Sequence, residues 1–128
     1  KAAIQLQQIF YRMTKYFIEN FNTANFLTEA LYHSKAASYF TNYRVQHFIF
    51  VRTLIEQAQR EGDICSDMNS YEIYTTLQSI LIQPIIIKNN ILQQHKNEPL
   101  MDKLKLIDVS SESSLQKRLR VAFKGLRP

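Results

Sequence analysis

Apolar residues recur every three or four positions along most of the chain, which is the period of an amphipathic α-helix. In the first segment Leu6, Phe10, Met13 and Phe17 set this spacing. No run alternates apolar and polar residues as a half-buried strand does. The pattern predicts an all-α fold, a bundle of five main helices over about residues 2–20, 24–34, 37–61, 70–93 and 111–125.

Residues that typically begin and end helices lie at the boundaries of these segments. The chain has only two glycines, Gly62 and Gly125, and each falls at the end of a helical pattern. Glycine adopts the left-handed conformation that closes a helix at its C-terminal end. Asp67 or Asn69 is expected to cap the start of the fourth helix, and a serine before Glu112 the start of the last.

The fourth helix is apolar on more than one side. A helix of this kind is buried against more than one neighbour, and in so small a chain the second neighbour can be another subunit. Pro84 lies in the middle of this helix and has no N–H to donate to the carbonyl of Ile80, so we expect a kink there. A short helical piece is expected to start near Pro99.

Composition supports one folded domain over residues 1–128, with 45% hydrophobic and 21% charged residues. No apolar run reaches the length of a membrane span, and no secretory signal is expected. The single cysteine, Cys65, suits a reducing cytosol, so a cytoplasmic location is expected. Because Lys1 is not a methionine, the chain is expected to be a fragment of a longer protein.

The net charge of +5 is concentrated after residue 112, where five basic residues and no acid occur. These residues are Lys117, Arg118, Arg120, Lys124 and Arg127. One interpretation is a surface for nucleic acid or an acidic partner. The other is a helix end that complements its own dipole, together with a solvated face.

Residues that would support catalysis or cofactor binding are sparse. Two glycines exclude a phosphate-binding glycine-rich loop, and no histidine has an acid or a second histidine at metal-ligand spacing. Cys65 has no histidine nearby in sequence and is interpreted as an ordinary thiol. We therefore expect neither an enzyme nor a bound cofactor or metal.

Aromatic residues are concentrated in the first fifty positions, and only Tyr71, Tyr74 and Phe123 come later. Aromatic walls with a few polar groups are typical of small-molecule pockets. His47 shares a helix stripe with Tyr43 and could bind a ligand or titrate near neutral pH. A plain aromatic core with satisfied polar tips remains the alternative. The candidate ligand-binding residues are Phe10, Met13, Phe17, Tyr43, His47, Phe50, Tyr74 and Gln78.

The sequence Glu56-Gln57-Ala58-Gln59-Arg60-Glu61-Gly62-Asp63-Ile64 resembles the C-terminal regulatory domain of tetracycline-repressor-type (TetR) transcription regulators. In that family a helix ends in a turn of this kind, and a capped apolar helix follows, as it does here after Asp67. The ending Phe123-Lys124-Gly125-Leu126 is also similar. The family's N-terminal helix-turn-helix is absent from this chain, so any contact with DNA would need a missing N-terminal domain.

The resemblance implies that the chain is the effector-binding and dimerisation domain of a transcription regulator. We expect this regulator to be a repressor and to make no contact with a membrane. The effector would be a small apolar or amphipathic molecule. The fourth and last helices would form the interface of a homodimer through Ile82, Ile86, Leu115, Leu119 and Phe123. A helical protein–protein interaction module without a small-molecule ligand is the alternative.

Overall fold

The computed structural model describes residues 1–20, 34–95 and 97–128, without the side chains of residues 34–41, 43 and 44. These ranges contain helices and no strand, which confirms the predicted all-α fold for them. The helices are α1 (Ala2–Glu19), α3 (Ser34–Arg60), α4 (Ser70–Leu81), α5 (Gln83–Gln94), α6 (Leu100–Lys105) and α7 (Glu112–Gly125). The predicted helix over 24–34 falls almost entirely on residues 21–33, outside the described part.

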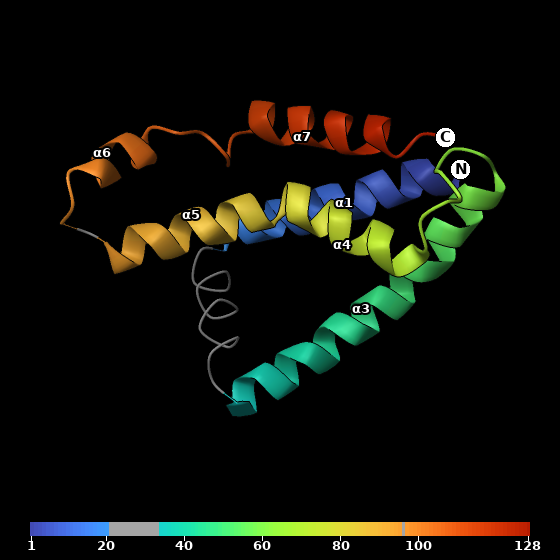
Figure 1. Cartoon of the computed structure of the whole chain (residues 1–128), viewed down its shortest axis with the longest axis horizontal. Helices are drawn as coiled ribbons and strands as arrows, with labels where there is room; N and C mark the ends of the chain where they lie inside the picture. The colour runs from blue at the N-terminus through green and yellow to red at the C-terminus, as the bar shows by residue number, and fades with distance from the viewer. Residues whose placement is uncertain (21–33, 96) are drawn as a thin grey trace.

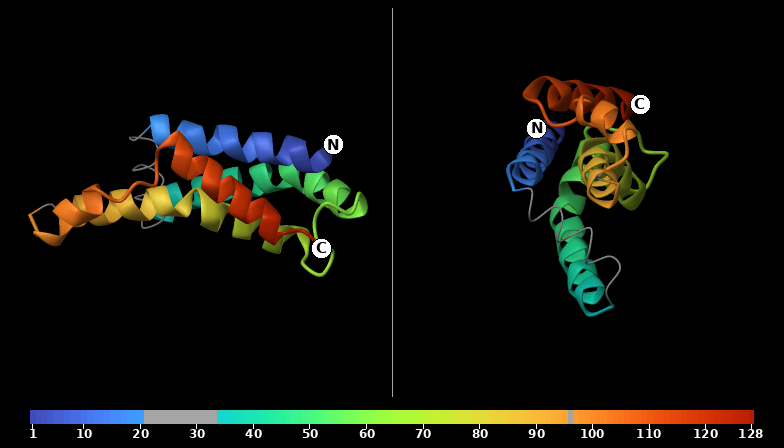
Figure 2. Two further views of the ribbon diagram at one scale, coloured as in Figure 1. Left: turned by 90° about the horizontal axis from the view of Figure 1, so that it is seen from above. Right: turned by 90° about the vertical axis from the view of Figure 1, so that its left-hand side faces the viewer.

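Helices α3 and α7 pack on different sides of α1 and α4 (Figures 1 and 2). On one side α3 contacts both α1 and α4, and on the other side α7 contacts both. Beyond α4, the chain continues as α5, and α6 folds back against it. None of the described helices is long and apolar enough to cross a membrane.

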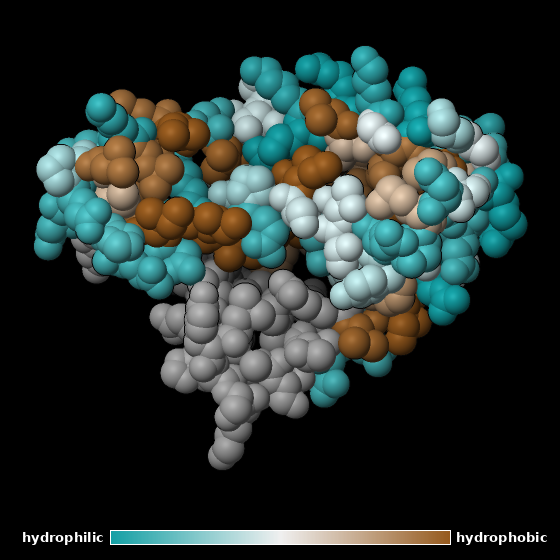
Figure 3. Space-filling view, in the orientation of Figure 1, coloured by the Kyte–Doolittle hydropathy of each residue, from teal (hydrophilic) through white to brown (hydrophobic). Residues whose placement is uncertain are grey.

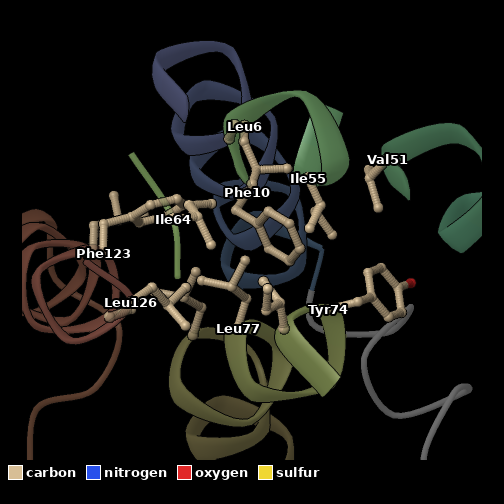
Figure 4. Packing of buried hydrophobic residues seen from close by; sticks show 14 of the residues in the cluster. Leu6, Phe10, Val51, Ile55, Ile64, Tyr74, Leu77, Phe123 and Leu126 are labelled. Carbon is tan, nitrogen blue, oxygen red and sulfur yellow. The ribbon is translucent and has the colours of Figure 1, made fainter. Parts of the chain in front are cut away.

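The core lies where α1, α3, α4 and α7 meet, and part of it is shown in Figure 4. Each helix contributes buried residues three or four positions apart, as an amphipathic helix must. Burying one large apolar side chain in such a core contributes about 1.5–3 kcal/mol to the stability of the fold. The largest fully buried apolar side chains are Leu6, Phe10, Val51, Ile55, Ile64, Ile73, Leu77, Leu81, Ile85 and Leu115.

The predicted kink at Pro84 is confirmed, since the expected helix over 70–93 is divided at Ile82 into α4 and α5. The N–H of Ile85 donates to the carbonyl of Ile82, at 3.0 Å, instead of reaching back a full turn. The carbonyl of Leu81 accepts a hydrogen bond from the Arg118 guanidinium of α7, at 3.1 Å. A side chain from a distant helix thus contacts the backbone at the kink.

Local sequence explains several helix ends. Gly62 has a φ of +82° after α3, as predicted. The Asn69 side chain and Glu72 form a reciprocal capping box at the start of α4. The Ser111 side chain caps α7 by accepting from the Ser114 N–H. The last helix ends at Gly125, as predicted, but this glycine does not adopt the left-handed conformation expected of it.

Candidate functional site

Aromatic rings from three helices meet within the core, where α1, α3 and α4 come together. The Tyr74 ring of α4 lies 5.5 Å from the His47 ring and 5.3 Å from the Phe48 ring, both of α3. Phe10 of α1 presents its ring edge-on, 6.2 Å from Tyr74 and 6.4 Å from His47. Together with Gln78 these residues form what we call the aromatic–histidine cluster.

The Tyr74 hydroxyl joins the polar groups of this cluster. It lies 2.7 Å from Nδ1 of His47, and it accepts a hydrogen bond from Nε2 of Gln78, at 3.0 Å. Burial lowers the pKa of His47, which favours the neutral imidazole. The hydroxyl can then donate to Nδ1, which places the imidazole proton on Nε2. The cluster therefore combines a hydroxyl, an amide and a ring N–H with aromatic surfaces.

Four of the candidate ligand-binding residues, Phe10, His47, Tyr74 and Gln78, are brought together in this cluster. Met13 and Phe17 lie on α1 and pack, partly buried, against the core. The Tyr43 side chain lies outside the described residues.

Phe50 lies outside the cluster, on an exposed face of α3. Its side chain is 66% exposed. The buried stripe of α3 runs through Val51, Ile55 and Ala58, whereas the sequence pattern placed Phe50, Leu54 and Ala58 on one face. Phe48 lies three positions before Val51 and so continues this buried stripe. It was not among the predicted site residues. Its spacing to Val51 and Ile55 was the pattern that could have identified it.

The His47 pKa gives the protein a pH-dependent stability. Because the folded pKa lies below the ordinary value of 6.5, the unfolded chain binds more protons in mild acid. The stabilisation from neutral His47 is therefore complete when the pH is above the ordinary pKa of the unfolded chain. It is lost as the pH falls through the lower pKa of the folded protein. We expect His47→Gln to lose less stability than the wild type between about pH 7 and pH 5. Urea titrations across this range measure the difference, and equal losses would contradict the prediction.

The five residues predicted to form a dimer interface have a different place in the structure. Ile82, Ile86, Leu115, Leu119 and Phe123 all belong to the buried core of the chain itself. The periodicity of the sequence correctly identified these side chains as buried. We expected a second subunit to bury them, whereas the chain's own helices do so. Their burial leaves only a small part of these side chains exposed for a second subunit to contact.

Exposed apolar residues gather instead on α5, on α6 and on the connection to α7. Figure 3 shows this concentration at the end of the molecule that carries α6. We call it the α5–α6 apolar surface; its exposed members are Ile87, Ile91, Leu100, Leu106 and Ile107. Clustered apolar side chains at a surface are typical of interaction sites.

The basic residues of the last helix divide into two groups. Arg118 is partly buried and donates to the Leu81 carbonyl, so it has a structural role. Lys117, Arg120, Lys124 and Arg127 are exposed, and among the described residues none of them forms an ion pair. Only Lys124 lies in the last turn of α7, so the helix dipole explains little of this charge.

Residues suited to metal or nucleophilic chemistry are not grouped in the part of the chain that the structure describes. No three His, Cys, Asp or Glu residues there could together hold a metal ion. Burial and the neighbouring Asp67 carboxylate raise the pKa of the Cys65 thiol, which keeps it protonated and weakly nucleophilic. Comparisons of the chain with protein-family models, with curated proteins and with solved structures find no match.

Proposed function

We propose that this chain is the effector-binding and dimerisation domain of a TetR-like transcriptional regulator, by expectation a repressor. The observation that carries the proposal is the aromatic–histidine cluster, in which Tyr74, His47 and Gln78 present hydrogen-bonding groups among aromatic rings. Such a combination suits a small apolar or amphipathic ligand, whose few polar atoms would exchange hydrogen bonds with these side chains. The sequence resemblance around Gly62 supports the same function.

The position of the cluster on α4 suggests how binding acts at a distance. Tyr74 and Gln78 lie on α4, and the carbonyl of Gln78 accepts from the N–H of Ile82 at the kink. An effector that binds one arrangement of α4 better than another would shift the population of kink geometries. Because α5 follows the kink directly, that shift would move the α5–α6 apolar surface.

The dimer in this proposal uses the α5–α6 apolar surface. A two-fold symmetric contact places the same patch of both subunits face to face. Paired through the exposed side of α7, two copies would bring Lys117, Arg120 and Lys124 against their equivalents, at a cost in repulsion. Paired through Ile87 and Leu106, they would cover apolar side chains instead.

A thermal-shift screen of apolar and amphipathic molecules tests the proposal. A ligand at a hundred times its dissociation constant should stabilise the domain by about 2.7 kcal/mol. Tyr74→Phe removes the shared hydroxyl and should reduce the shift at a fixed ligand concentration. Tyr71→Phe makes the same change on an exposed ring of α4 and is the matched control.

Three outcomes would count against the proposal. The first is a screen without a stabilising molecule, and the second is a ligand shift that Tyr74→Phe leaves unchanged. The third is a monomer in sedimentation of the same sample at high concentration, which would remove the dimer.

The alternative, a protein–protein interaction module, rests on the same α5–α6 apolar surface. There the surface would contact a different protein, and the aromatic–histidine cluster would be core alone. The screen separates the two functions, because an interaction module without a ligand site gives no small-molecule shift.

A further inference from the structure

A groove runs between α1 and α7 and reaches Gly62 and Asp63, just after the end of α3. It consists of two adjoining depressions of about 460 Å³ and 470 Å³. Both are lined by Gln7 of α1 and by Phe123 and Arg127 at the end of α7. The shared residues make them one continuous feature, which we call the α1–α7 groove.

The lining of this groove is apolar at its base and cationic along one edge. Leu119 and Phe123 are almost completely buried and form the base. Arg120, Lys124 and Arg127 line the same depression, which has no acidic lining residue. The adjoining depression has one, Asp63, at its end.

Two acids on the elements beside the groove, in the described part of the chain, bond to other groups. Glu112, at the start of the same helix, bonds to Lys15 and to the Tyr11 hydroxyl of α1. Glu61 accepts from the backbone N–H of Ala2. The cations along the groove therefore remain available to an anionic partner.

We propose that the α1–α7 groove binds an acidic, amphipathic peptide segment of a partner protein. Its carboxylates would pair with the cations of α7, and its apolar side chains would cover the base beside Phe123. Single-stranded nucleic acid fits less well, because its bases stack on exposed aromatic rings, and Phe123, the aromatic side chain of the groove lining, is buried. This interaction goes beyond the proposed ligand sensing and does not require it.

The probe is a short fluorescent peptide in which glutamates surround leucines at helical spacing. Gln7→Glu places a carboxylate in the groove wall and should weaken binding of this peptide by about two- to fivefold. Gln8→Glu makes the identical change on the neighbouring exposed residue, outside the groove lining, and should leave binding unchanged. Fluorescence anisotropy with the full chain measures both affinities.

A second pair of variants removes charge instead of adding it. Arg120→Gln combined with Lys124→Gln should weaken the peptide about tenfold, whereas Lys103→Gln combined with Lys105→Gln, on α6, should not. Added salt should weaken binding of the wild type. Equal losses in both pairs, no binding of the peptide, or tighter binding of duplex DNA that displaces the peptide would each overturn the proposal.

Discussion

Replacing Phe10 with alanine should lower the free energy of unfolding by about 3–5 kcal/mol, the largest single effect we expect. The Phe10 side chain is fully buried and lies between α1, α3 and α4. Its removal leaves a cavity at the centre of the core and takes the edge-on ring away from His47 and Tyr74. Urea unfolding monitored by circular dichroism gives the change directly.

Phe50→Ala is the matched control for this substitution. It deletes the same atoms from a side chain that is 66% exposed, so we expect a loss within about 0.5 kcal/mol. Similar losses for Phe10→Ala and Phe50→Ala would show that the buried stripe of α3 and the packing of α1 differ from those described.

The second large effect concerns Arg118, whose replacement by alanine should cost about 1–3 kcal/mol. The substitution leaves the Leu81 carbonyl at the kink without its hydrogen bond from α7. The hydrogen bond from Arg118 to the Ser114 hydroxyl is also lost. Arg120→Ala removes an exposed arginine from the same helix and should change stability by less than about 0.5 kcal/mol.

A double-mutant cycle with Pro84→Ala tests the physical reason for the Arg118 effect. Alanine restores the N–H that proline lacks, so the helix can straighten and the Ile85 N–H can return to the Leu81 carbonyl. Arg118→Ala should then cost less in the Pro84→Ala background than alone, by at least about 0.5 kcal/mol. Strictly additive losses would mean that Arg118 contributes through packing and not through this carbonyl.

The helices themselves were predictable because their periodicity and end residues are local properties of the sequence. The kink follows from the covalent structure of Pro84 alone, and the Asn69 cap follows from side-chain chemistry within one turn. The contact of Arg118 with the kink was not predictable. It joins residues 37 positions apart, and nothing in the sequence near Arg118 indicates which carbonyl it meets.

Two interpretations differ from the packing of the chain, because periodicity leaves a choice that only packing decides. On α3 the stripe through Phe50 and the stripe through Val51 both satisfy helical spacing, and the chain buries Val51 and exposes Phe50. On α5 and α7 the buried faces were identified, but a pattern cannot distinguish a chain's own core from a partner's. Both choices depend on how neighbouring helices are oriented.

The position of α7 also has a consequence for synthesis of the protein on the ribosome. Residues of α7 complete the core against α1 and α4, although they follow α1 by about a hundred positions. During translation the apolar faces that receive Leu115, Leu119 and Phe123 stay uncovered until the last of these residues leave the exit tunnel. Nascent chains that lack α7 would expose those faces, which makes them natural clients of chaperones.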